Sequence, residues 1–197
     1  VQDGRTGRGR PAMNPRLPWT NLTNAALYQA GWFACVLGAS AGRPWLGTIL
    51  GSGLACAHLI LSEERAREGR LLAFALILGL LVDTAHLRTG ALVFSAGSIH
   101  PDYAPPWILV LWVQFASTLR YCMHWLRGRF ILGAILGSCA GAAAYAAGVR
   151  LGAAQFGPDL TRSVIQIAVS WGAAVPCMLF VLDRVDPSGV PGRYRTF

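Results

Sequence analysis

The sequence contains no lysine, so all 17 of its basic residues are arginines. Charged residues make up only 13% of the 197 residues, against about 25% in an average soluble protein, while hydrophobic residues make up 54%. The formal net charge is +8, but no basic stripe interleaved with aromatic residues occurs, so nucleic acid is not an expected partner. The arginines fall between long apolar runs, which predicts a membrane protein.

The sequence also lacks the short motifs that carry metal or phosphate chemistry. The five cysteines form no CxxC pair, each lies inside an apolar run, and their number is odd, which supports neither a disulfide framework nor a zinc site. There is no HExxH motif and no P-loop. We therefore predict no metal and no cofactor, and the sequence leaves open whether the protein is an enzyme.

What the sequence does contain is a series of long apolar segments. We predict an all-α fold, a polytopic bundle of six transmembrane helices over residues 22–41, 45–61, 71–88, 105–129, 130–150 and 160–182. Residues 1–18 are rich in Gly, Arg and Pro and are expected to form a disordered extension, with Met13 favoured as the true start. The membrane domain is predicted over 19–184 and an irregular tail over 185–197. Residues 62–70, SEERAREGR, are predicted to form a water-exposed loop.

The arginines predict the orientation of such a bundle. Six spans place both termini on one side, and that side then collects 12 arginines, whereas the opposite side collects three. The three are Arg43, Arg88 and Arg162, and Arg120 and Arg150 lie within predicted helices. Because cytoplasmic loops are enriched in Arg and Lys, both termini are predicted to be cytoplasmic.

A small set of polar residues lies inside the predicted spans and predicts a polar pocket for a lipid or small amphiphile. The predicted pocket residues are Gln29, Asp83, His86, Gln114, Arg120, His124 and Tyr145. Asp83 is the only carboxylate well inside a span, and the helical rise places it about 9 Å from the level of Arg120, so we predict an Asp83–Arg120 pair. His86 and Arg150 are competing partners. Such a pair either fixes helix register or takes part in function.

Three further segments support a resemblance. YQAGWFACVLGASAGRPWLG at 28–47, LLVD at 80–83 and PPWILVLWVQFASTLRYCMHWL at 105–126 are similar to a bacterial inner-membrane family catalogued as domain of unknown function 2878. The following segment, 133–153, is also similar. Family motif positions map onto Gln29, Trp32, Asp83, Trp107, Trp112, Phe115, Thr118, Leu119, Tyr145 and Gly148. The resemblance implies a multi-pass protein of the bacterial inner membrane, whose genes often lie near those of cyclopropane-fatty-acid-synthase-like and flavin amine-oxidase-like proteins.

Three functions follow as hypotheses. The first is an accessory role in membrane-lipid modification, with membrane lipids, a lipid or small-molecule ligand, and a membrane or cytoplasmic enzyme as partners. The second is a small proton-coupled transporter that uses Asp83. The third is a haem-binding redox subunit, with His58 and His124 as axial ligands at similar depth.

Overall fold

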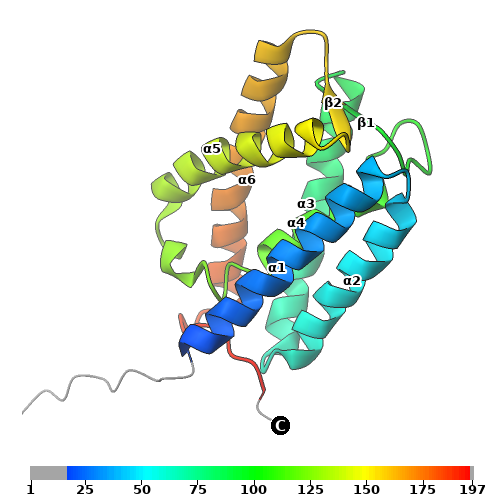
Figure 1. The fold of residues 1–197 in the computed structure, drawn as a ribbon. Coiled ribbons are helices and arrows are strands. Elements are labelled where there is room, and N and C mark those ends of the chain that lie inside the picture. Colours follow the sequence, from blue (N-terminus) through cyan, green and yellow to red (C-terminus); the bar gives the residue numbers. More distant parts are fainter. Residues whose placement is uncertain (1–16, 196–197) are drawn as a thin grey trace, which may run out of the picture.

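The computed structural model describes residues 17–195, and the predicted start at Met13 lies outside them, as does all but the end of the predicted extension. The described part is an all-α fold with six α-helices, which confirms the predicted class (Figure 1). The elements are α1 (Leu17–Ser40), α2 (Pro44–Leu61), α3 (Arg65–Arg88), β1 (Leu92–Phe94), α4 (Pro106–Ala116), the 3₁₀ turn η1 (His124–Leu126), α5 (Phe130–Arg150), β2 (Ala154–Phe156) and α6 (Leu160–Val185).

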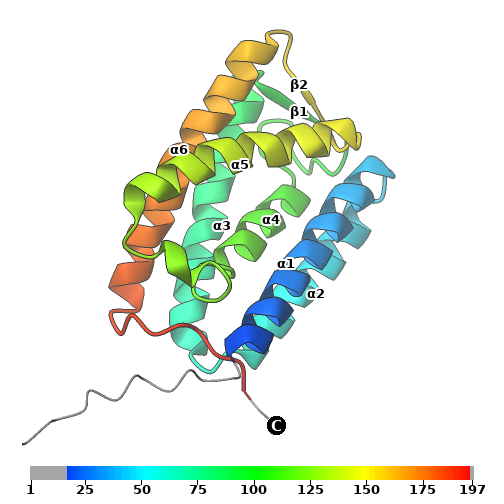
Figure 2. The same cartoon turned by 60° about the vertical axis from the view of Figure 1, so that its left-hand side comes forward.

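The short helix α4 lies at the centre of the fold. It contacts α1, α2 and α3, while the most extensive helix pairings join α1 to α2 and α5 to α6. Figure 2 shows the α1–α2 pair on one side of α4, α3 and α6 on the other, and α5 above α4, where it crosses in front of α6 and α3 at a steep angle to α6. Strands β1 and β2 pair antiparallel, with Leu92 opposite Phe156, and they close the end of the molecule away from the two termini.

Four of these helices are long and apolar enough to cross a membrane, namely α2, α3, α5 and α6. Helix α4 is apolar but has only 11 residues. Prolines at the first turns of α2 and α4 suit their positions, because the missing N–H has no helical partner there. Asp159 caps α6 by accepting a hydrogen bond from the backbone N–H of Arg162 at 2.9 Å.

The prediction of one continuous helix over 105–129 is wrong. Helix α4 ends at Ala116, and the chain then runs through turns to η1. From Thr118 onward most backbone N–H groups reach back three residues instead of four, as in the 2.9 Å bond from Thr118 N to Phe115 O, and Met123 N reaches back five residues to Thr118 O. The hydroxyls of Ser117 and Thr118 also donate to the carbonyls of Gln114 and Phe115, which offers the backbone an alternative to the helix.

Helices α1 and α2 approach closely because glycines line their contact. In the sequence, Gly47 and Gly51 form a GxxxG pair, which predicts close approach by another helix without saying which one. A Cβ atom at Gly47 would lie 2.5 Å from the carbonyl oxygen of Ala34 and 3.0 Å from the Cα of Cys35. A Cβ at Gly51 would lie 2.7 Å from the sulfur of Cys35. The predicted close approach is confirmed, and at Gly47 it is an approach to backbone atoms that cannot move aside.

We expect Gly47→Ala to lower the free energy of unfolding by about 1–3 kcal/mol, because the added methyl group overpacks a backbone contact. Gly53→Ala on the same helix is the matched control, since nothing lies within 4 Å of a Cβ there. Unfolding by SDS titration in mixed micelles measures both variants. Equal stabilities for the two variants would contradict the close packing of α1 on α2.

Candidate functional site

A groove lined mainly by aromatic side chains opens between α1 and α5, with α4 as its floor and the two strands at one end. We call it the aromatic groove, and its empty space is about 540 Å³ including its mouth. Eight of its lining residues are aromatic, namely Tyr28, Trp32, Phe94, Trp107, Trp112, Phe115, Tyr145 and Trp171. The groove exists because α1 pairs with α2 and α5 pairs with α6, which leaves α1 and α5 with little direct contact.

A second hollow extends the aromatic groove along α5 towards the turns after α4. Its empty space is about 440 Å³, and its walls include Met123, Leu126 and Val175. The two hollows share four bordering residues, Tyr28, Phe115, Ala144 and Trp171. The two adjacent hollows follow one another along α5 between α1 and α5, and no charged residue is among the residues that line them; we call the pair the apolar path.

Asp83 lies directly behind the wall of the aromatic groove. Its side chain is fully buried, and both carboxylate oxygens accept hydrogen bonds from groove residues. Tyr145 Oη donates to Oδ1 and Trp112 Nε1 donates to Oδ2, each at 2.6 Å. Trp112 also stacks on Trp171, with ring centroids 4.3 Å apart. Two of the lining side chains are therefore fixed in place by one buried carboxylate on α3.

His86 lies one turn beyond Asp83 on α3 and is also buried. Its Nε2 lies 3.0 Å from Ser170 Oγ, and its Nδ1 lies 3.1 Å from Gln166 Nε2, both on α6. Its ring meets that of Tyr145 edge-on, with centroids 6.1 Å apart. Of the predicted pocket residues, the structure brings together Asp83, His86 and Tyr145.

Arg120 is not the partner of Asp83, and that predicted pair is wrong. Its guanidinium instead binds three other carboxylates: Glu68 at 3.1 Å, Asp186 at 3.0 Å and Glu64. The prediction failed because it assumed a straight helix through Arg120, whereas the chain turns after Ala116. Glu68 and Asp83 are 15 residues apart on α3, or about 22 Å at helical rise, so Arg120 binds at the opposite end of that helix.

The carboxylates around Arg120 belong to a buried ionic network at the end where the termini lie. His58 Nε2 is 2.8 Å from Glu68 Oε1, and His58 Nδ1 is 2.8 Å from the hydroxyl of Tyr194. Both ring nitrogens of His58 are thus bound within the protein, and neither is free for a haem iron. Among residues 17–195, no group of three His, Cys, Asp or Glu side chains is placed to hold a metal ion.

Asp186 closes this network from the end of α6. Its carboxylate is buried and accepts a hydrogen bond from the guanidinium of Arg120. The guanidinium of Arg127 donates to the backbone carbonyl oxygen of Asp186. Burial alone would raise the pKa of Asp186, but the hydrogen bonds from Ser188 and the charges of Arg120 and Arg127 outweigh it and lower that pKa below its ordinary value. The network therefore holds Asp186 as a carboxylate.

A known protein family matches most of this chain. The family described as "Protein of unknown function (DUF2878)" matches residues 21–177, which is most of the chain. The chain belongs to the DUF2878 family. Searches of curated proteins and of solved structures gave no match for this DUF2878 protein. The matched segment contains every residue that borders the aromatic groove, from Tyr28 to Trp171, together with Asp83. It ends before Asp186 and the tail.

The remaining predicted pocket residues of this DUF2878 protein lie away from the groove. Gln29 is exposed on α1. Gln114 is buried between α1 and α2, where its Nε2 donates to the carbonyl of Gly51 at 2.6 Å. His124 lies in η1 with its Nε2 3.2 Å from the carbonyl oxygen of Gly189. Gln29 is exposed, Gln114 belongs to a helix contact and His124 to a contact with the tail, so the predicted pocket is smaller than expected.

Sequence reasoning missed the acidic half of the ionic network. Residues 62–70 are not an exposed loop, because α3 begins at Arg65 and Glu68 is fully buried. A signal was present: Glu64, Glu68, Leu71 and Ala75 follow helical spacing and share one face with the apolar helix that follows.

The pentapeptide at 38–42 matches the GxSxG pattern of serine hydrolases, but Ser40 ends a helix and donates to the carbonyl of Leu37, so no strand-to-helix elbow forms.

Proposed function

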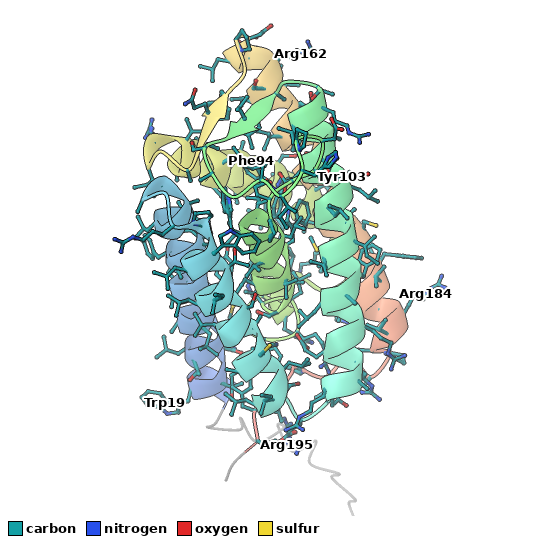
Figure 3. The ribbon with its side chains drawn as sticks, turned by 90° about the vertical axis from the view of Figure 1, so that its right-hand side faces the viewer. Trp19, Phe94, Tyr103, Arg162, Arg184 and Arg195 are labelled. Carbon is teal, nitrogen blue, oxygen red and sulfur yellow. The ribbon has the colours of Figure 1, made fainter. Side chains whose placement is uncertain are left out.

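We propose that this DUF2878 protein is a multi-pass protein of the bacterial inner membrane that holds a lipid or small amphiphile in the aromatic groove. In this proposal all six helices lie in the membrane and both termini are cytoplasmic. The distribution of arginines, 12 against three, supports that orientation. The ends of the described chain lie together, and Arg162 and Arg195 lie at opposite ends of the molecule (Figures 1 and 3), which also agrees with it.

The single observation that carries the proposal is the elongated apolar path between α1 and α5. An acyl chain needs a long, uncharged channel, and the two hollows that share Tyr28, Phe115, Ala144 and Trp171 offer that shape. The path lies between two helix pairs, so a ligand would enter sideways from the bilayer. At the strand end it passes the ring of Tyr145, whose hydroxyl donates to the buried carboxylate of Asp83.

We expect Ala144→Phe to reduce lipid binding strongly, because Ala144 borders both hollows and a phenyl ring there would block the path. Ala143→Phe is the matched control, since the neighbouring residue is exposed on α5 and borders neither hollow. Native mass spectrometry of protein purified in a mild maltoside detergent counts the retained lipids. Equal lipid retention by the two variants would overturn the proposed groove.

The accessory role in fatty-acid modification is the finer part of the proposal. The gene neighbours of the family that this sequence resembles support it, because methyltransferases of that type act on membrane lipids. The two variants Ala144→Phe and Ala143→Phe also test this role. In a deletion strain, the Ala143→Phe gene should restore the fatty-acid profile and the Ala144→Phe gene should not. A profile that the deletion leaves unchanged would overturn the accessory role while leaving lipid binding intact.

A proton-coupled carrier is the second candidate, and one observation favours it. Tyr145 borders the groove and donates to Asp83, so its hydroxyl joins a ligand path to a buried carboxylate. A carrier needs such a group to take up and release a proton as the ligand moves. The haem hypothesis has no comparable support, since both ring nitrogens of His58 are bound within the ionic network.

A further inference from the structure

A second groove runs along the outside of the molecule between α3 and α6. We call it the α3–α6 groove, and its empty space is about 1310 Å³ including its wide mouth. It shares no lining residue with either hollow of the apolar path. The large apolar side chains that line it, Leu81, Ile165 and Val169, are all exposed. Because α3 and α6 are both long and apolar enough to cross a membrane, these side chains are placed to meet acyl chains.

At the start of α6 the groove ends in polar and charged side chains, and Figure 3 shows Arg162 at this end of the molecule. The guanidinium of Arg162 has no hydrogen bond or ion pair to any residue from 17 to 195. Asp159 caps α6 with its Oδ1 oxygen, and its Oδ2 oxygen has no partner in that part of the chain. The hydroxyl of Thr161 is also unpaired there. One cation, one carboxylate oxygen and one hydroxyl thus border the groove without partners.

The order of residues along the groove matches the layers of a bilayer leaflet. A head-group layer is about 5–7 Å thick and covers a hydrocarbon core about 30 Å thick. Gln166 lies four residues after Arg162, or about 6 Å deeper, and Val169 lies about 10 Å deeper. On α3, Leu81 lies seven residues before the end of the helix, which is also about 10 Å. The charges therefore lie at head-group depth, and the apolar walls lie at the depth of acyl chains.

We propose that the α3–α6 groove binds a phospholipid with an ethanolamine head group. Its phosphate accepts hydrogen bonds from the guanidinium of Arg162 and the hydroxyl of Thr161. Its primary ammonium donates to the free carboxylate oxygen of Asp159, and one acyl chain lies against Leu81 and Val169. This inference rests on the membrane position that the proposed function gives α3 and α6, but it does not depend on the aromatic groove.

The two charges at the mouth of the groove distinguish this lipid from other phospholipids. A phosphatidylglycerol offers its phosphate to Arg162 but has no ammonium, and its net negative charge is opposed by Asp159. A phosphatidylcholine carries a cation, but its trimethylammonium group has no N–H to donate to the carboxylate. The ethanolamine lipid is the one of the three that matches both charges and supplies the hydrogen bond, so we expect it to bind most tightly.

Native mass spectrometry of the delipidated whole protein tests this order with the ethanolamine, choline and glycerol phospholipids carrying the same two oleoyl chains. Arg162→Gln should bind the ethanolamine lipid about five-fold more weakly than the wild-type protein. Arg150→Gln, at an exposed arginine that borders neither groove, is the matched control and should bind it unchanged. Asp159→Asn should keep the cap of α6, since Asn also caps helices, and should lose the preference for ethanolamine over glycerol.

Equal binding of the three lipids by the wild-type protein, or equal binding by Arg162→Gln and Arg150→Gln, would overturn the inference. It is also wrong if glycerophosphoethanolamine, which has no acyl chains, displaces the lipid at the same concentration, because the groove then recognises a soluble phosphate compound.

Ala144→Phe separates this site from the proposed function, because Ala144 borders the apolar path and not the α3–α6 groove. This variant should keep the lipid that depends on Arg162. If it loses that lipid, the lipid lies in the apolar path, so the inference is wrong and the proposed function stands. If Ala144→Phe retains as many lipids as Ala143→Phe while Arg162→Gln binds more weakly, the proposed function is wrong and the inference stands.

Discussion

Replacing Arg120 with leucine is expected to lower the free energy of unfolding of this protein by about 3–5 kcal/mol. The guanidinium is 1% exposed and binds Glu64, Glu68 and Asp186, of which the last two are fully buried. Removing it leaves Glu68 with only the imidazole of His58, and Asp186 with Arg67 at 3.2 Å and Arg127 at 3.6 Å. A buried carboxylate that loses its central cation costs more than the original interaction contributed. Unfolding by SDS titration in mixed micelles measures the loss.

Arg129→Leu is the matched control, because it makes the same chemical change at an exposed arginine nine residues further on. Its expected effect on the free energy of unfolding is within about 0.5 kcal/mol. Adding Glu68→Gln to Arg120→Leu should recover part of the loss, since it removes the buried charge that has no arginine left beside it. If Arg120→Leu and Arg129→Leu are equally stable, the ionic network does not hold this end of the protein together.

The same variant should also release the C-terminal segment. Gly192 N–H donates to the carbonyl of Arg120 at 2.6 Å, and the rings of Tyr121 and Tyr194 stack with centroids 4.8 Å apart. The hydroxyl of Tyr121 donates to Ser62 Oγ at 2.8 Å, next to the bridge that Ser62 forms with Tyr194. Arg120 thus links the end of α2, the start of α3 and the tail. The sequence predicted only an irregular tail here, because its partners lie more than 60 residues away.

How well the sequence predicts this fold depends on how local each signal is. Hydropathy located α2, α3, α5 and α6, because each is a long apolar run between turn residues. Glycine spacing predicted a close helix approach at Gly47 and Gly51 for the same local reason, and the structure shows that α1 is the helix that packs there. Hydropathy could not locate the end of α4, because large apolar residues continue between the polar ones through residues 117–126 while the backbone changes its hydrogen-bond pattern.

The candidate site was predicted in part. Single residues could be found from the sequence, whereas the contacts between them depend on the three-dimensional packing of the helices. Asp83 stood out as the one carboxylate deep in an apolar helix, and Tyr145 as a polar aromatic in a helix of small residues, so both could be found from composition. Their joining by a hydrogen bond depends on the steep crossing of α5, which no periodicity encodes. Trp112 was read as a family position, but its role as a donor to Asp83 appears only in three dimensions.

Asp83→Ala is expected to lower the free energy of unfolding by about 1–3 kcal/mol for each donor that it leaves unpaired. Two donors depend on this carboxylate, the indole N–H of Trp112 and the hydroxyl of Tyr145. SDS titration measures the loss. Asp83→Asn should cost far less, because the amide oxygen can accept from Trp112 while the amide N–H₂ donates to the Tyr145 oxygen. Equal losses for the two variants would contradict this geometry.

This difference makes Asp83→Asn the variant that separates the two proposed functions, since it removes the charge and keeps the fold. A proton-coupled carrier requires a carboxylate that changes protonation, so Asp83→Asn should abolish any uptake into proteoliposomes that depends on a pH gradient. An amphiphile-binding protein requires the groove, so the same variant should still retain neutral ligands, whereas Ala144→Phe should lose them. A carboxylate that serves only to fix Trp112 and Tyr145 would leave both measurements unchanged in Asp83→Asn, because the amide replaces both hydrogen bonds.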